Sequence, residues 1–182
     1  LKVIDKLLDM IEDVADNLDE EISRLSFHIF SKCLILQPEE PVENEYGVVE
    51  AGSIGMSLLS DNYEGIYQIS IPYITNNITS DNWRLKDAAV TVFGSLMCSE
   101  FAHPQILVLI QHTISLLPHY LQSNQHLTLR RSTAWTIGRL FTGKFSLLLS
   151  LNNNLVLLLS SLINSLNDST NNSSVLQQTL HS

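Results

Sequence analysis

The segment 38–47 contains four carboxylates. Its composition predicts that it is a loop. The segment holds two prolines, a closing glycine and four glutamates, namely Glu39, Glu40, Glu43 and Glu45. No Lys or Arg lies between Lys32 and Arg84, so these carboxylates have no cation close to them in the sequence. A loop on a rigid scaffold that carries such charges can dock cations. The pattern therefore indicates either a docking site for a basic partner or an ordinary solvated linker.

Trp135 is a second candidate for partner binding, through its ring. It follows Arg131 by four residues and precedes Arg139 by four, so the three share one face of a helix predicted from about residue 126 to 141. The core stripe of this helix is predicted at Leu129, Thr133, Ile137 and Leu140. An indole off that stripe either covers a groove between helices or stacks on a partner's Lys or Arg stem, worth roughly 0.5–2 kcal/mol.

Catalytic and metal-binding patterns do not emerge. The sequence has no Gly-rich phosphate loop, no GxSxG turn and no Cys/His arrangement for nucleophilic catalysis. His112 and His119 are seven residues apart, whereas helical zinc ligands lie four apart. Cys33 and Cys98 belong to no CxxC motif and are expected to be buried thiols. We therefore predict a protein that is not an enzyme and holds neither metal nor other cofactor.

The charge of the chain is unevenly distributed. The 182 residues carry a net charge of −9, but residues 1–80 hold 15 Asp/Glu against 4 Lys/Arg, whereas residues 81–182 hold 4 against 6. An acidic half argues against nucleic acid as a partner, because phosphate contacts need clustered Lys and Arg. Its field favours a basic partner instead, or the carboxylates are simply solvated helix faces.

A repeated pattern predicts the fold. DNWRLKDAAVTVFGSLM, which begins at Asp81, aligns with HLTLRRSTAWTIGRL at a spacing of roughly 44 residues. A period of this length with two helices per period is typical of HEAT repeats, in which each helix pair stacks on its neighbours. The predicted fold is all-α, a right-handed HEAT-repeat solenoid of stacked antiparallel helix pairs, and the chain is expected to be a fragment. The expected units are 1–19 (partial), 20–60, 61–99, 104–142 and 144–182.

Hydrophobic periodicity and helix breakers predict the individual helices. They are expected over residues 1–13, 20–36, 48–59 and 62–77, in a helix capped by Asp81, and over 105–121, 126–141, 145–166 and 171–182. The helix 20–36 has its apolar positions at Ile22, Leu25, Ile29 and Cys33. Small residues at 51–55 predict close packing of the next helix. The run 145–166 is interrupted by Asn152–Asn154, which favours a buried or broken core helix over a membrane span.

The two aligned segments also resemble a known family. NWRLKDAAVTVFGSL, followed one repeat later by TAWTIGRL, resembles the paired segments DWRxRDAAVxAFG and RDTAAWTVGR in the central HEAT repeats of importin-β (karyopherin-β). The resemblance implies a nuclear transport receptor that binds basic cargo or importin-α segments, the GTPase Ran and possible nucleoporin partners. It also implies shuttling between cytoplasm and nucleus across the nuclear envelope, without nucleic-acid binding or membrane insertion.

The resemblance gives roles to particular residues. Trp135 would stack on the basic importin-α segment, and the loop 38–47 would lie where the family binds Ran. Tyr46 stands where the family has a Trp after its acidic loop, and it joins the candidate partner-binding residues. A structural ladder between repeats would be formed by Lys86, Asp87 and Arg130.

The family pattern is incomplete in this chain. Arg131 replaces the family's Asp, and Gln178 stands where the next repeat would have a Trp. Two alternative interpretations are therefore a HEAT scaffold subunit of a multiprotein complex and a degenerate receptor that binds no cargo. One fold hosts many functions, so the fold alone does not decide between them.

Overall fold

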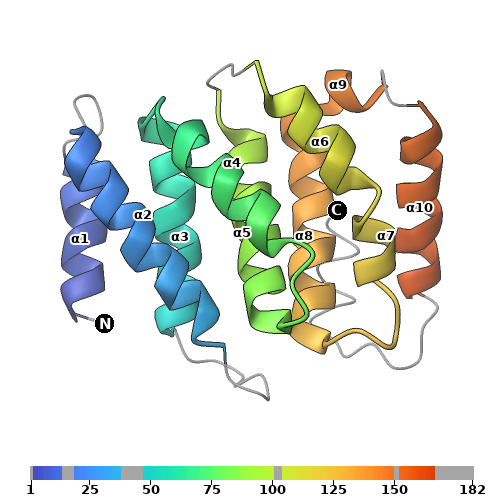
Figure 1. Ribbon diagram of the computed structural model, residues 1–182, viewed down its shortest axis with the longest axis horizontal. Coiled ribbons are helices and arrows are strands. Elements are labelled where there is room, and N and C mark those ends of the chain that lie inside the picture. Colours follow the sequence, from blue (N-terminus) through green and yellow to red (C-terminus); the bar gives the residue numbers. More distant parts are fainter. Residues whose placement is uncertain (1, 14–18, 38–46, 101–103, 150–151, 167–182) are drawn as a thin grey trace. The chain divides into compact units, whose positions relative to one another are not determined.

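The chain consists of helices joined by turns in the parts that the computed structural model describes, with no strand among them (Figure 1). These parts are residues 2–13, 19–37, 47–100, 104–149 and 152–166. They belong to two compact units, unit 1 (residues 1–101) and unit 2 (residues 102–182). The all-α prediction is confirmed.

Unit 1 is built from helix pairs. Its described helices are α1 (Lys2–Asp13), α2 (Glu20–Ile35), α3 (Val48–Asn62), α4 (Ile66–Asn77) and α5 (Trp83–Cys98). α2 pairs with α3 and α4 pairs with α5, each as antiparallel neighbours, and α3 also packs against α1 and α5 (Figure 1). The start of α2, its end and the start of α3 agree closely with the predicted ranges.

Small residues let α2 and α3 approach closely. A Cβ on Gly52 would lie 2.8 Å from Cys33 Cβ and 3.1 Å from Phe30 O, and a Cβ on Gly55 would overlap the Phe30 ring. Each Gly costs a helix about 0.8–1 kcal/mol relative to Ala. The full burial of the Phe30 ring offsets this cost. The predicted close packing of this helix is confirmed.

The buried face of α2 is not the one that the apolar positions indicated. Cys33 is buried, but Ile22, Leu25 and Ile29 are 40%, 59% and 39% exposed. The buried residues are instead Ser23, Ser26, Phe27, Phe30, Ser31, Cys33 and Leu34. This face is rotated by roughly a quarter turn from the predicted one. The reason is that the two phenylalanine rings bury more apolar area than the isoleucines, while the serines leave room for the neighbouring helix.

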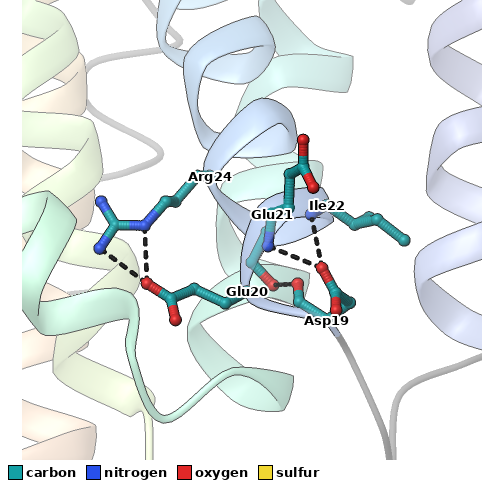
Figure 2. Close-up of polar contacts among 6 residues, drawn as sticks. Asp19, Glu20, Glu21, Ile22 and Arg24 are labelled. Atoms are coloured by element: carbon teal, nitrogen blue, oxygen red, sulfur yellow. Dashed lines mark hydrogen bonds and ion pairs between the residues drawn. The ribbon is translucent and has the colours of Figure 1, made fainter.

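Local sequence determines where α2 begins (Figure 2). Asp19 Oδ1 accepts hydrogen bonds from the backbone N–H groups of Glu21 at 2.8 Å and Ile22 at 3.4 Å. Glu20 and Arg24, one turn apart, form an ion pair at 2.9 Å in which both side chains are largely exposed. Asp19 is therefore the N-cap of α2, and the carboxylates of the first turn favourably oppose the helix dipole.

The N-cap of α5 is Asn82 rather than the predicted Asp81. Asn82 Oδ1 accepts a hydrogen bond from the Arg84 N–H at 3.0 Å, and the Asn82 N–H donates to Ser80 Oγ at 3.2 Å. Asn and Asp cap helices about equally well, so the sequence could not separate the two neighbours. The hydrogen bond from the Asn82 N–H to Ser80 Oγ holds the turn before the helix and so favours Asn82 as the cap. Beyond its first turn, α5 is buried at every residue from 87 to 97.

Two of the helices predicted in unit 2 are each divided into two shorter ones. Its described helices are α6 (Ile106–Ile114), α7 (Leu117–Tyr120), α8 (Leu127–Gly143), α9 (Phe145–Leu149) and α10 (Asn152–Leu166). The predicted helix 105–121 is divided into α6 and α7, because Pro118 has no N–H to donate to the preceding turn. The Leu116 N–H bonds to Thr113 O at 2.9 Å, which tightens the chain at this break.

The predicted helix 145–166 is also divided, into α9 and α10. α10 begins at Asn152, the first of three consecutive asparagines, a residue type that favours helix ends over helix interiors. Leu148 of α9 and Leu158 of α10 are fully buried, so both helices contribute to a core. In the ranges described, no helix has the length and apolar content to cross a membrane. The predicted helix 171–182 lies outside the described residues, and the repeat-unit boundaries stay a prediction.

Candidate partner-binding surface

One face of α8 is buried, as the sequence predicted. The predicted core stripe is confirmed, because its four residues are all inaccessible to solvent: Leu129, Thr133, Ile137 and Leu140. Thr133 Oγ1 donates to Leu129 O at 2.6 Å, which satisfies the hydroxyl within the helix. His126 caps α8, since its Nδ1 accepts from the Thr128 N–H at 3.3 Å. The buried face sets the rotation of α8 about its axis and so the direction of its other side.

That other side carries Arg131, Trp135 and Arg139, which we call the Arg–Trp–Arg row. All three side chains are partly exposed. The guanidinium carbon of Arg139 lies 5.4 Å from the centroid of the Trp135 ring, within the range of a cation–π contact. The prediction that the three residues share a face away from the core stripe is confirmed. Contact of Trp135 with a partner stays a prediction.

The row belongs to a unit that is nearly free of carboxylates. Unit 2 holds four basic residues against one acidic residue, a net charge of +3. The acidic residue is Asp168, which lies outside the described residues. Arg130 is only 2% exposed, whereas Lys144 is partly exposed. The described surface of unit 2 therefore carries positive charge without carboxylates of its own.

Unit 1 contains a buried polar cluster that joins the end of α2 to the start of α5. Gln37 Nε2 donates to Asp87 Oδ2 at 2.7 Å, and Arg84 Nε donates to Gln37 O at 2.8 Å. Asp87 is fully buried and Gln37 is 8% exposed. A buried carboxylate destabilises a fold unless hydrogen-bond donors surround it. The cluster therefore ties the residue that precedes the segment 38–46 to α5.

Of the three predicted ladder residues, Asp87 takes part in this hydrogen-bonded cluster, which lies within unit 1. Lys86 is partly exposed, and Arg130 belongs to unit 2 and is buried. The ladder between repeats stays a prediction. Sequence reasoning missed Gln37 and Arg84, because 50 residues separate Gln37 from Asp87 and no periodicity links them. Nothing in the sequence around Gln37, which directly precedes Pro38, indicates that its side chain is buried.

The predicted acidic docking residues lie outside the described residues: Glu39, Glu40, Glu43, Glu45 and Tyr46. On their C-terminal side the described chain resumes at Gly47, the N-cap of α3, whose carbonyl accepts from the Ala51 N–H at 3.0 Å. Unit 1 as a whole has 18 Asp/Glu against 6 Lys/Arg, a net charge of −12. Most of its described carboxylates are exposed, with Asp87 the buried exception.

The histidines and cysteines show no common site. His112 and His119 are both exposed. Within the described ranges, no group of three or more His, Cys, Asp or Glu side chains is placed to hold a metal ion. Cys33 is buried, and this burial raises the pKa of its thiol, whereas Cys98 is partly exposed. The prediction of two buried thiols therefore holds for Cys33 alone.

Unit 2 also has an apolar hollow of about 360 Å³. It is lined by Phe141, Phe145, Leu159 and Leu162. The rings of Phe141 and Phe145 lie 6.3 Å apart between centroids. None of the four lining side chains offers a polar group that would orient a ligand, which small-molecule sites normally provide.

The chain was compared with known proteins. No family model matches it. Importin subunit beta-1 of Saccharomyces cerevisiae is 30% identical over 134 residues, which make up 73% of this chain and 14% of that relative. Among solved structures, Kap95p with RanGDP has a TM-score of 0.75 at 20% identity, covering 97% of this chain and 21% of that one. The Kap95:Nup1 complex gives a TM-score of 0.74 with the same identity and coverage.

These matches extend over most of this chain but over a small part of the relatives. The likeness in fold to importin-β confirms the predicted HEAT-repeat solenoid. The sequence match supports the resemblance that the segments around Asp81 and Trp135 indicated. By its sequence over 134 residues and its fold over 97% of its length, the chain belongs to the importin-β family.

Proposed function

We propose that this chain is a partner-binding part of a nuclear transport receptor. The observation that carries the proposal is the sequence match to importin subunit beta-1 over 134 residues, on a chain with the importin-β fold. The chain spans 14% of that relative, so it would supply part of a binding surface rather than a whole receptor. Its role would be binding without catalysis.

Basic segments of cargo or of an importin-α-type adaptor are the proposed partners of unit 1. Its net charge of −12, carried largely by exposed carboxylates, attracts cationic segments and speeds their encounter. Tyr46 would add a ring for a cation–π contact. Four of the carboxylates counted in this charge would contribute to capture directly, those of Glu39, Glu40, Glu43 and Glu45.

Ran and nucleoporins are proposed as further partners. The support is that solved structures of the same fold include Kap95p with RanGDP and with Nup1. Ran would bind at or near the segment 38–47, as the resemblance implies. A receptor with these partners would move between cytoplasm and nucleus and meet the nuclear envelope. Trp135 is proposed as an aromatic anchor for a partner of unit 2, distinct from the basic segment that unit 1 would bind, and the ladder residues would hold the repeats in order.

A HEAT scaffold without cargo binding is the second candidate function. The observation that favours it is the Arg–Trp–Arg row, in which Arg131 stands where the family has an Asp. A basic segment that approached Trp135 would meet like charges there, which weakens binding. Such a chain would keep the importin-β fold and hold other proteins in place.

The proposal is tested by calorimetric titration of the chain with a basic importin-α-type segment at low and high salt. We expect salt-sensitive binding that weakens about tenfold when Glu39, Glu40, Glu43 and Glu45 are all changed to Gln, since surface ion pairs contribute about 0.2–1 kcal/mol each. The matched control changes four exposed carboxylates elsewhere in unit 1, so that the net charge changes equally: Asp9→Asn, Asp13→Asn, Glu50→Gln and Glu64→Gln. Absence of binding, or equal losses in both variants, would contradict this mechanism.

A further inference from the structure

The Arg–Trp–Arg row combines an aromatic ring with two guanidinium groups on one partly exposed strip of α8. Arg131 and Arg139 each lie four residues from Trp135, so one helical turn separates each arginine from the ring. Arg139 already holds its guanidinium carbon 5.4 Å from the ring centroid. The ring therefore has a cation of its own chain beside it. The row presents positive charge around an apolar platform.

We propose that this row docks an acidic segment of a partner protein, with a carboxylate on Arg131 and an apolar side chain on Trp135. Guanidinium groups match carboxylates through paired, charge-assisted hydrogen bonds. Trp and Arg are also the residue types that most often dominate binding energy at protein interfaces. This inference goes beyond the proposed function and does not rest on it, because it uses only the charges and geometry of unit 2.

Charge complementarity indicates that the partner segment is acidic. Unit 2 has a net charge of +3, and no carboxylate occurs in its described residues 104–149 and 152–166. A lysine-rich segment on Trp135 would lie next to the guanidinium group of Arg131, which repels it. An acidic segment would meet attraction at the same positions.

The number of cations in the row favours a protein segment over a nucleic acid. Nucleic-acid binding typically rests on about 6–10 phosphate contacts from clustered Lys and Arg. The row offers two arginines, and the chain as a whole has a net charge of −9, which repels an extended polyanion. A carboxylate beside an apolar side chain fits Arg131 and the indole of Trp135.

The test follows Trp135 fluorescence in the whole chain carrying Trp83→Phe, so that Trp135 is the only indole. The ligands are a short synthetic peptide of glutamate and leucine, its lysine counterpart of the same length, and a thymidine oligonucleotide. We expect the glutamate peptide to bind, to change Trp135 emission and to bind less tightly as salt rises. Arg131→Glu should weaken it about tenfold, whereas Arg131→Lys should keep most of the affinity.

The matched control is Lys144→Glu, which changes the net charge equally at a cation of unit 2 outside the row, and which should alter affinity by less than about twofold. Circular dichroism confirms the fold of each variant. The proposal is overturned if Arg131→Glu binds the glutamate peptide as well as the control does. It is equally overturned if the oligonucleotide binds more tightly than the peptide, or if the lysine peptide changes Trp135 emission.

Two outcomes separate this inference from the proposed function. Lysine-peptide binding that leaves Trp135 emission unchanged, together with binding of the glutamate peptide, supports both proposals. Glutamate-peptide binding without any lysine-peptide binding supports the acidic partner while contradicting basic-segment capture by unit 1. Sedimentation of the free chain tests whether a second copy of the chain, rather than a partner protein, occupies the row. A dimer that Arg131→Glu dissociates would assign the row to a second copy and would overturn the acidic-partner proposal.

Discussion

Unit 1 and unit 2 are built from the same kind of element but differ in charge and in where they keep their polar groups. Unit 1 has a net charge of −12 and buries one carboxylate, Asp87, against the Gln37 amide. Unit 2 has a net charge of +3 and leaves Trp135 partly exposed on the same face of α8 as Arg131 and Arg139. Helix-pair repeats are stabilised by their buried faces, which leaves the exposed faces free to differ. We infer that partner selection in this chain follows surface charge within each unit rather than the shared fold.

Two phenylalanines, one in each unit, differ in how completely they are covered. In unit 1 the Phe30 ring is fully buried against the glycines of α3. In unit 2, Phe145, Val156 and Ile163 remain 47%, 65% and 57% exposed. A ring packed against backbone loses its contacts entirely when truncated, whereas an exposed ring loses little. Phe30 and Phe145 should therefore respond differently to the same substitution.

The largest effect is expected for Phe30→Ala, which should lower the free energy of unfolding by about 3–5 kcal/mol. The matched change in unit 2, Phe145→Ala, removes a half-exposed ring and should cost about 1 kcal/mol or less. Denaturant unfolding gives the totals, and amide hydrogen exchange shows which unit opens. Equal losses for the two variants would contradict the difference in packing between the two rings.

A smaller loss is expected for Asp87→Ala, which deprives the Gln37 amide of its acceptor inside unit 1. Leaving a buried donor unsatisfied costs about 1–3 kcal/mol. Asp81→Ala is the control, because Asp81 is exposed and does not cap α5, and it should change stability by less than about 0.5 kcal/mol. If Asp81→Ala proved the more costly of the two, both the cap assignment and the role of the cluster would be wrong.

At the exposed start of α2, the cap and the ion pair should contribute unequally to the free energy of unfolding. Asp19→Ala removes the acceptor for two backbone N–H groups and should cost about 1 kcal/mol. Arg24→Ala breaks an ion pair whose side chains are 54% and 67% exposed, so it should cost about 0.2–1 kcal/mol, and less at high salt. Thermal unfolding at two salt concentrations distinguishes them, since only the ion pair should respond strongly to salt.

The smallest effect at neutral pH is expected for Tyr73→Phe. The Tyr73 hydroxyl is buried without a hydrogen-bond partner among the described residues, so its removal should be neutral or slightly stabilising. Burial raises the pKa of Tyr73 from 10.0 to about 12. Because the folded state favours the neutral phenol, its contribution to stability is complete below about pH 10 and is lost as pH rises towards 12.

Alkaline unfolding followed by phenolate absorbance checks this pH dependence. Tyr73→Phe should reduce the loss of stability between about pH 10 and 12. Tyr120→Phe provides the comparison in unit 2, where burial also raises the tyrosine pKa. An unchanged alkaline transition in the Tyr73 variant would contradict the desolvation of this side chain.

Patterns that lie within one helix were the predictable part of the structure. The stripe of Leu129, Thr133 and Ile137 in α8 was predicted from spacing, and so was the position of Trp135 off that stripe. Both follow from the helical period alone. The small residues of α3 signalled close packing for the same reason, because a helix rich in Gly needs tertiary contacts to be stable.

Features that depend on contacts distant in sequence were not predictable. The Gln37–Asp87 hydrogen bond joins residues 50 apart, and no local pattern marks either of them as a partner. The rotation of α2 away from Ile22 and Ile29 depends on the shape of α3. At the start of α5, two adjacent residues cap equally well, and a contact from Ser80 decided between them.

The most direct test of the account is an amide NMR titration of the chain, first with the lysine peptide and then with the glutamate peptide. We predict that the lysine peptide shifts resonances of unit 1 and leaves the Arg–Trp–Arg row unchanged. The glutamate peptide should shift residues around Arg131, Trp135 and Arg139 and spare unit 1. If both peptides shifted the same unit, or if the lysine peptide bound at Trp135, the claim that surface charge divides the partners between the two units would be contradicted.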